Sequence, residues 1–254
     1  MSTARSTPER SLFVSWRDPQ GSIHPVGLLL RRMEASEERF SFAYLKGAER
    51  LADFVPLPGL PDLHRRYDST DLFPVFANRI MPRSRPDFDL LAERIDLAGD
   101  ADPFEVLART GGRRATDRIE VFSAPVRTEA SDSCALFFAR GIRHVPGASD
   151  AVSALAVGDR LVLIDDGTNE HNPRAVVLRA DDGQQIGWIP DYLVEHVHDL
   201  RHLNGSDPIV EVEHVNDTSV ASHLRLLCRM TAPWPEGYEP FTDALFEPLV
   251  PLRP

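Results

Sequence analysis

The chain has 254 residues, 42% of them hydrophobic and 26% charged, and this composition excludes a disordered or fibrous protein. Its length fits one large domain or two domains of about 100–150 residues each. No apolar run approaches the roughly 20 residues that a membrane-spanning helix needs, and residues 1–10 lack the apolar stretch of a secretory signal. We therefore expect a cytoplasmic protein that makes no membrane contact.

The net charge of −11 is unevenly distributed, with −1 on residues 1–130 and −10 on residues 131–254. A chain this acidic is a poor candidate for broad, sequence-blind binding to nucleic acid. Lys46 is the only lysine, so arginine supplies almost all of the positive charge. Arginine binds phosphates with two parallel donors and stacks on bases better than lysine does. Cys134 and Cys228 lie among apolar residues, and we expect buried, reduced thiols.

The first half of the chain predicts a small sheet with short helices. Alternating apolar residues at Leu12, Val14 and Trp16 indicate a strand, and the turn at 18–21 leads into a second strand to form a hairpin. Asp102 followed by Pro103 is typical of a helix start. The expected strands are 11–16, 23–30, 40–44 and 117–122, and the expected helices are 71–80, 87–96 and 102–108.

The second half is predicted to be rich in strands. Six short apolar runs separated by turn residues, with one late helix at 190–198, favour a small antiparallel barrel or sandwich. Six prolines after Ala232 indicate an extended tail, which Phe241, Phe246 and Leu249 would attach to the body of the protein. The expected strands are 134–139, 160–164, 175–178, 185–189, 209–214 and 224–230.

These elements predict an α+β, mainly β protein. The expected domain organisation comprises a flexible N-terminus, a first domain, a polar linker, a second domain and an extended C-terminal tail. Their respective ranges are 1–10, 11–125, 126–133, 134–232 and 233–254.

Four motifs follow one another in the second half. They are Gly141-Ile-Arg-His-Val145, Val157-Gly-Asp159, Thr168-Asn-Glu-His-Asn-Pro-Arg-Ala175 and Ile186-Gly-Trp-Ile-Pro190. In this order and at these separations, they resemble the motifs of the HIRAN domain family. The resemblance covers about residues 134–230.

The HIRAN resemblance implies a small OB-like antiparallel β-barrel, with one or two helices, that binds single-stranded DNA at a free 3′ end. Bases would stack on planar side chains, and polar groups would hold the terminal sugar and phosphates. The matching positions are Arg143 and His144, expected on the first strand, and Asn169, His171 and Asn172 on a loop; Arg174 and Trp188 complete the candidate nucleic-acid-binding set. The family's proline and aspartate in this loop are replaced by Glu170 and Asn172.

The first half resembles the N-terminal part of HipA-type toxin kinases over about residues 12–122. The motifs that carry this resemblance are Val26-Gly27, Phe40-Ser-Phe-Ala-Tyr44, residues 71–78 and residues 102–107 followed by Gly111-Gly112. The sequence has neither a Gly-rich phosphate loop nor a kinase catalytic loop, and the HIRAN-like half occupies the place of the kinase body. We therefore expect no kinase activity.

Clustered arginines in the first half have two interpretations. They form either a solvated face balanced by nearby acids or a patch of auxiliary phosphate contacts that extends DNA binding. The candidates for auxiliary contacts are Arg79, Arg83, Arg85, Arg113 and Arg114.

Other chemistry finds little support in the sequence. His196, His198 and His202 are the closest set of histidines, but no cysteine pair with zinc-site spacing accompanies them, so we expect neither a metal nor a cofactor. No Gly-x-Ser-x-Gly motif marks a nucleophile. The paired carboxylates at 165–166 and 181–182 fall in expected turns.

The leading hypothesis is a non-enzymatic protein whose HIRAN-like barrel binds single-stranded or damaged DNA, in repair or in defence of a bacterial cell. The alternative is a protein-interaction module derived from a toxin's N-terminal domain, with an antitoxin-like or nuclease partner. A cryptic hydrolase is the weakest of the three. The sequence makes no prediction about the oligomeric state.

Overall fold

The structure is a computed structural model that describes residues 10–34, 37–114 and 116–252. The chain divides into two compact units. Unit 1 takes its residues from 1–85, 102–124 and 241–254, and unit 2 takes its residues from 86–101 and 125–240. Across the described ranges, no helix is both long and apolar enough to span a membrane.

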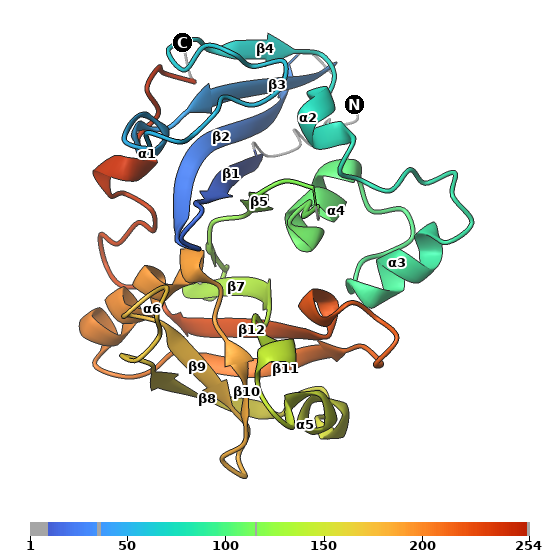
Figure 1. The fold of residues 1–254 in the computed structure, drawn as a ribbon, viewed down its shortest axis with the longest axis vertical. Coiled ribbons are helices and arrows are strands. Elements are labelled where there is room, and N and C mark those ends of the chain that lie inside the picture. The colour runs from blue at the N-terminus through green and yellow to red at the C-terminus, as the bar shows by residue number, and fades with distance from the viewer. Residues whose placement is uncertain (1–9, 35–36, 115, 253–254) are drawn as a thin grey trace. The chain divides into compact units, whose positions relative to one another are not determined.

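Unit 1 contains a five-stranded antiparallel sheet with the order β4-β3-β2-β1-β5 (Figure 1). The pairing of β1 with β2 shifts between Val14 and Ser15, and Pro25 pairs with Ser15 just after the shift. A proline is tolerated inside a sheet at such an irregularity because the ladder is already interrupted there. The strands are β1 (Arg10–Arg17), β2 (Ile23–Glu34), β3 (Glu37–Tyr44), β4 (Tyr67–Ser69) and β5 (Ile119–Phe122).

Helix α4 (Pro103–Thr110) shows how local sequence sets an element of unit 1. The Asp102 side chain accepts hydrogen bonds from the first-turn amides, Glu105 completes a capping box, and Gly111 ends the helix in the left-handed conformation with φ of 72°. Asp102 also pairs with the buried Arg31 of β2 through two hydrogen bonds of 2.8 and 3.2 Å. One carboxylate thus caps the helix and fastens it to the sheet. The other helices of unit 1 are α1 (Lys46–Glu49) and α2 (Pro74–Ala77), with a 3-10 turn η3 (Ala244–Phe246).

Unit 2 contains a seven-stranded antiparallel sheet with the order β10-β9-β8-β11-β12-β7-β6. The sheet is not a closed barrel, but one isolated bridge between Arg140 and Trp188 joins the end of β10 to the segment after β7. The strands are β6 (Val126–Arg127), β7 (Asp132–Phe138), β8 (Arg160–Asp165), β9 (Val176–Arg179), β10 (Gln185–Trp188), β11 (Ile209–Val215) and β12 (Leu226–Pro233).

A buried arginine holds the small helices of unit 2. The Arg225 guanidinium donates to the backbone oxygen of Asn216 and to oxygens of Ser149 and Ser153 on α5. The Asn216 amide donates to the backbone oxygen of Arg94 at the end of α3. The helices are α3 (Phe88–Arg94), α5 (Ala148–Ala154) and α6 (Asp191–Asn204), with 3-10 turns η1 (Ile142–His144) and η2 (Ser222–Leu224).

The expected fold class is confirmed, because both sheets are antiparallel and the protein is mixed α+β and mainly β. Most observed strands begin and end within four residues of the predicted limits. The segment 141–145 was expected to belong to a strand and instead forms η1, where Gly141 turns the chain with φ of 72°. The sequence analysis missed β4, β6, α1 and α5, all of seven residues or fewer.

Contacts divide the chain differently from the predicted domain limits. Residues 86–101 group with unit 2, the expected linker at 126–133 contains β6 and the start of β7, and the tail divides at residue 241. The predicted attachment of the tail is confirmed within unit 1. Phe241 and Phe246 pack edge-on against Phe13, and the Leu249 amide bonds to the Tyr44 carbonyl. Most of the predicted N-terminal segment lies outside the described residues.

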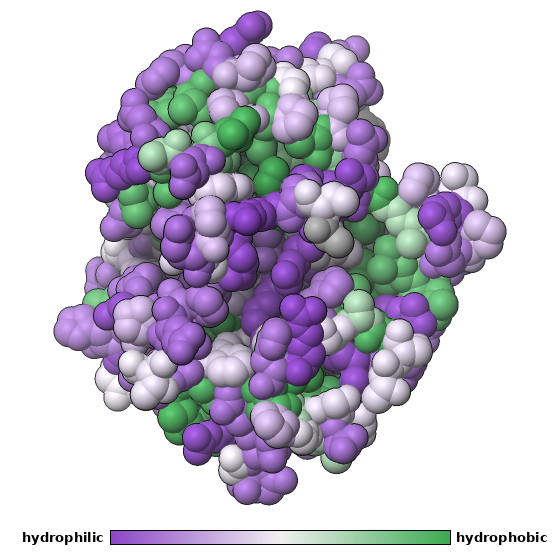
Figure 2. Space-filling model, viewed as in Figure 1, coloured by the Kyte–Doolittle hydropathy of each residue, from purple (hydrophilic) through white to green (hydrophobic). Residues whose placement is uncertain are grey.

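Hydrophilic side chains cover most of the face of the molecule seen in Figure 2, with smaller hydrophobic areas between them. The interiors are apolar. In unit 1 the core includes Leu12, Leu29, Phe42, Phe76 and Leu107, none of which exceeds 1% exposure.

Candidate nucleic-acid interface

The candidate interface of unit 2 is built around Trp188. This residue ends β10 and pairs with Arg140 through two backbone hydrogen bonds of 2.9 Å. Its ring lies against the backbone of Gly141, where a side-chain Cβ would come within 2.4 Å of Trp188 Cε3. A glycine is therefore required at 141 by the close approach of the ring as well as by its positive φ. Trp188 is half-buried, which agrees with neither a fully buried core residue nor an open stacking platform.

A carboxylate fixes the edge of the Trp188 ring. The indole Nε1 donates to Asp166 Oδ2 at 2.9 Å. This hydrogen bond and a second from Thr168 hold the pKa of Asp166 below its ordinary value, so the carboxylate is ionised at neutral pH. Asp166 begins the loop between β8 and β9, and the bond therefore ties that loop to Trp188.

Asparagine side chains shape this loop from within. Asn169 Oδ1 accepts hydrogen bonds from the backbone amides of His171 and Asn172, both at 3.1 Å. Asn172 Oδ1 accepts from the amide of Arg174 at 2.9 Å, and its Nδ2 donates to Asp191 at 3.2 Å. The predicted loop location of these residues is confirmed. Their side-chain oxygens are committed to turns of the type that asparagine favours.

Arg174 is exposed but paired. Its Nε donates to Glu195 on α6 at 2.7 Å, and its carbonyl lies 2.9 Å from Nε2 of His198. The two charged side chains are 53% and 64% exposed, so the pair is a weak one that solvent screens.

Arg143 and His144 are neighbouring exposed residues of the predicted set. Both are exposed on η1, immediately after the Gly141 backbone that supports Trp188. Arg143 Nε donates to His144 Nε2 at 2.9 Å, which requires a neutral imidazole with its proton on Nδ1. Trp188 therefore connects the two predicted groups, with η1 on one side and the 166–174 loop on the other.

The auxiliary arginines of unit 1 have different environments. The Arg79 side chain is 3% exposed and bonds to both carboxylate oxygens of Asp117, at 3.1 and 2.5 Å, and to the carbonyls of Val75 and Gly112. Its role is structural. Arg113 lies 3.9 Å from Glu120, and Arg114 donates to the Asn78 carbonyl. Arg83 and Arg85 are exposed. Phosphate contact by these four remains a prediction.

The histidines of α6 do not converge on one point. His196 is buried with Ser133 and Tyr238, while His198 bonds to the Arg174 carbonyl. Within the described ranges, no group of three or more His, Cys, Asp or Glu side chains is placed to hold a metal ion.

A chain of polar side chains, buried at Ser133 and His196, runs from β7 through α6 to the segment that follows β12. Ser133 Oγ lies 3.0 Å from His196 Nε2, His196 Nδ1 lies 2.7 Å from the Tyr238 hydroxyl, and that hydroxyl donates to Asp199 at 3.3 Å. Burial lowers the pKa of His196 to about 4. Ser133 is 1% exposed, so a substrate carbonyl has no path to its hydroxyl. His196 is 2% exposed, so both members of this serine–histidine pair are buried in unit 2.

Sequence reasoning missed the acidic partners of the interface. Asp166, Asp191 and Glu195 bond to Trp188, Asn172 and Arg174 respectively. Asp191 directly follows the Ile-Pro motif, and Glu195 lies one helical turn later, so α6 presents both toward the loop. Only the pairing of distant segments reveals these contacts, because the partners are 19 to 22 residues apart.

Comparison with known proteins gives two weak structural likenesses. A protein from Lactobacillus plantarum aligns with a TM-score of 0.32 and 18% identity, over 39% of this chain and 97% of that one. The HIRAN domain of human HLTF aligns with a TM-score of 0.30 and 13% identity, over 41% of this chain and 80% of that one. Scores this low do not establish a relationship. No family model and no curated protein matches the sequence.

Proposed function

We propose that this chain is a non-enzymatic protein that binds single-stranded or damaged DNA through unit 2. One observation carries the proposal: two exposed side chains suited to nucleic acid, Arg143 and His144, lie on a glycine-initiated turn supported by a tryptophan. The four ordered motifs that resemble the HIRAN family also support it, and Arg143 and His144 belong to the first of them.

Each residue has a distinct part in the proposed binding. The Arg143 guanidinium contacts a phosphate, and the planar His144 ring stacks on a base, an interaction worth about 1–3 kcal/mol when well placed. Trp188 supports the turn. Asn169 and Asn172 fix the conformation of the loop through hydrogen bonds to its backbone. His171 lies at the loop surface, where it contacts the DNA strand.

Charge limits the strength of this binding. Asp166, Asp191 and Glu195 all lie at the interface, and Glu195 is paired with Arg174. Binding therefore depends on stacking and a small number of phosphate contacts, without a wide positive field to attract the strand.

Recognition of a 3′ end is a further part of the proposal. The family's loop aspartate is Asn172 here, but Asn172 Nδ2 lies 3.2 Å from a carboxylate oxygen of Asp191. That carboxylate supplies a hydrogen-bond acceptor for the terminal 3′ hydroxyl, next to the position where the HIRAN family has an aspartate. Asp191 then replaces the missing group from a different element.

Fluorescence anisotropy of the full chain with labelled single strands tests the proposal. We expect micromolar binding at low salt, weaker binding when the 3′ hydroxyl is blocked, and loss of binding in the Arg143→Ala/His144→Ala double variant. Arg50→Ala serves as the control for the loss of an exposed positive charge. Absence of binding at low salt contradicts the whole proposal. If blocking the 3′ hydroxyl leaves the affinity unchanged, only the proposed recognition of the 3′ end is contradicted.

A protein-interaction module is the second candidate. It is favoured by exposed apolar side chains on β8, where Val162 and Ile164 are 47% and 38% exposed, and by the acidic partners around the interface. A stoichiometric protein that remains bound after nuclease treatment, and is released by Val162→Asp, favours this candidate over DNA binding.

A further inference from the structure

Unit 1 contains a pocket of about 420 Å³ on its sheet. This volume lies within the range of small-molecule sites, which is roughly 300–1,000 Å³. Three of the residues that line the pocket are arginines. The full lining comes from β2, β3 and the segment around β4 and comprises Arg32, Glu34, Arg39, Phe40, Ser41, Arg66, Asp68, Ser69 and Thr70.

Strand register explains why polar groups gather in this pocket. Arg32 pairs with Arg39 across β2 and β3, and Ser41 pairs with Asp68 across β3 and β4. Cross-strand partners point to the same face, so these four side chains share one side of the sheet. The intervening residues Arg31 and Phe40 face the other side, where both contact Phe104.

The short β4 strand keeps the pocket open. It pairs with β3 only from Phe40 to Phe42, whereas β2 and β3 continue together to the pair of Glu34 and Glu37. The end of the β2–β3 hairpin therefore projects beyond β4, and its polar face has no third strand beside it.

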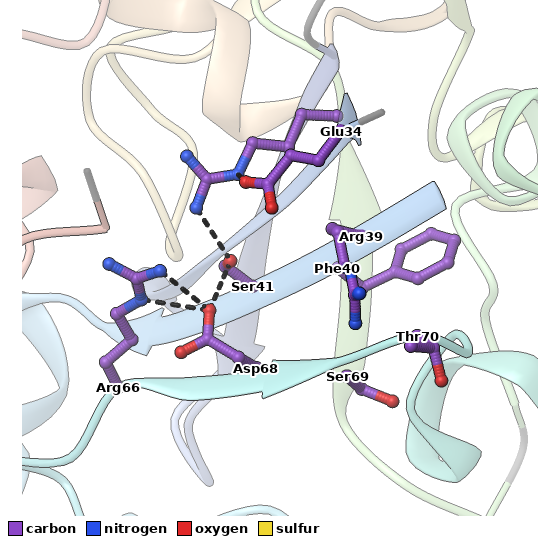
Figure 3. A pocket seen from close by; sticks show the side chains of 9 residues that line it. Glu34, Arg39, Phe40, Ser41, Arg66, Asp68, Ser69 and Thr70 are labelled. Carbon is purple, nitrogen blue, oxygen red and sulfur yellow. Dashed lines mark hydrogen bonds and ion pairs between the residues drawn. The ribbon is translucent and has the colours of Figure 1, made fainter. Parts of the chain in front are cut away.

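The acid at the centre of the pocket is already neutralised. Ser41 Oγ donates to Asp68 Oδ1 at 2.7 Å, and Arg66 Nε donates to the same oxygen at 2.9 Å; Figure 3 shows the two side chains meeting there. Burial raises the pKa of Asp68, but these hydrogen bonds and the charges of Arg66 and Arg32 outweigh it and hold the pKa below the ordinary value. Asp68 and Arg66 thus balance each other.

The two remaining arginines are only loosely held. Arg32 is 17% exposed, and its buried Nε has no hydrogen-bond partner although Glu34 Oε1 lies 3.1 Å away. Its Nη2 reaches Ser41 at a long 3.5 Å. Arg39 pairs with Glu37, which is 69% exposed. Carboxylates as exposed as Glu34 and Glu37 swing into solvent at little cost, so both guanidinium groups remain available to an anion.

We propose that this pocket binds the phosphate group of a small phosphate monoester. Arg32 and Arg39 lie opposite each other on adjacent strands, and guanidinium groups bind phosphate oxygens with paired, charge-assisted hydrogen bonds. The pocket is larger than inorganic phosphate needs, so it also holds the organic part of the ester. The proposal is independent of DNA binding by unit 2.

Isothermal titration of the full chain at low salt, with uridine 5′-monophosphate, uridine and inorganic phosphate as probes, tests this site. We expect the nucleotide to bind at least tenfold more tightly than either other probe. Arg39→Gln and Arg32→Gln each weaken nucleotide binding about tenfold, whereas Arg50→Gln, which removes an exposed arginine of the same unit, leaves it unchanged. Because Arg32 is largely buried, Arg39→Gln is the variant with less risk to folding.

The side-chain Nε–H signal of Arg32 in ¹⁵N NMR spectra gives a second readout in the unmodified protein. We expect it to shift with the nucleotide and not with uridine. The proposal is overturned by any one of four results: no nucleotide binding, equal binding of uridine, binding of inorganic phosphate as tight as that of the nucleotide, or undiminished nucleotide binding in both pocket variants.

Discussion

The two units bury their positive charges in different ways. In unit 1, the buried Arg31 and Arg79 each face a carboxylate, Asp102 and Asp117, with two hydrogen bonds to its oxygens. In unit 2, the buried Arg225 bonds only to carbonyl and hydroxyl oxygens. The position of an arginine in the sequence therefore says little about its function until the partners of its guanidinium group are known.

The difference extends to the surface. The loosely held arginines of unit 1 line a pocket, while the predicted contacts of unit 2 lie beside acids on α6 and the 166–174 loop. A nearly neutral half of the sequence thus contains the better anion site, and the acidic half contains a surface suited to stacking.

The largest expected effect separates the two kinds of buried arginine. Arg79→Met leaves Asp117 without its partner and costs about 3–5 kcal/mol of unfolding free energy. Arg225→Met removes a buried charge together with its hydrogen bonds to neutral oxygens, and costs about 1–3 kcal/mol. Urea unfolding followed by tryptophan fluorescence measures both, with Arg50→Met as the control. Equal losses would show that the carboxylate partners do not matter.

The pH dependence of stability should also differ between the units. Unfolded His196 has the ordinary pKa of 6.5 and folded His196 a pKa of about 4, so the unfolded state binds the extra proton. Stability of unit 2 is therefore full above pH 6.5 and falls by about 3 kcal/mol as the pH drops to 4.

Unit 1 should respond at lower pH. Burial raises the pKa of Asp102, but bonds from Arg31 and the α4 amides outweigh it and lower the pKa, so this contribution is lost only below the ordinary value of 3.8. Urea midpoints between pH 2 and pH 8 cover both ranges and measure both effects. His196→Gln, which cannot titrate, should flatten the profile; an unchanged profile in that variant would assign the dependence to other groups.

A smaller effect distinguishes the His144 ring from the ion-paired Arg174 at the interface. His144→Ala should weaken binding to single-stranded DNA about tenfold, or 1.4 kcal/mol, because a stacking ring is lost. Arg174→Ala should change affinity by less than about twofold, because Glu195 already balances that charge. Anisotropy titrations measure the affinity of the two variants for single-stranded DNA. A larger loss in Arg174→Ala than in His144→Ala would place the DNA along α6.

The smallest effect concerns salt. If Arg143 and one further arginine contact phosphates, the logarithm of the binding constant should fall with the logarithm of salt concentration at a slope of about −1.4. A slope of about −4 or steeper would require many phosphate contacts. That result would support auxiliary phosphate contacts by Arg83, Arg85, Arg113 and Arg114.

Much of the fold follows from local patterns. Alternation of apolar residues predicted β1, short apolar runs between turn residues predicted β8 and β11, and the Asp102–Pro103 start predicted α4, because these signals depend on neighbours a few residues apart. The short α5 has too few apolar residues to show a helical period, and β4 has only three residues. Both depend on tertiary contacts, and both were missed.

The candidate sites were predictable to different degrees. The motifs marked Arg143, His144 and the loop asparagines, but the close approach of Trp188 to Gly141 and its bond to Asp166 came only from the structure. Arg79 entered the predicted phosphate contacts because its burial with Asp117, 38 residues away, leaves no local signal. The Arg31–Arg32 pair stood out in the sequence as a cluster of positive charge, but the pocket of Arg32, Arg39 and Arg66 was not predicted, since strand register brings these three arginines together.

The sequence by itself determined the fold class, the order of most strands and the residues of the four motifs, because hydrophobic period, turn residues and caps act over short distances. The tertiary structure decided which arginines are buried, which acids accompany the interface, and where three strands leave a polar face open. Those outcomes depend on strand register and on contacts between distant segments. Charge that looks alike along the chain therefore acquires different roles only when the sheets have formed.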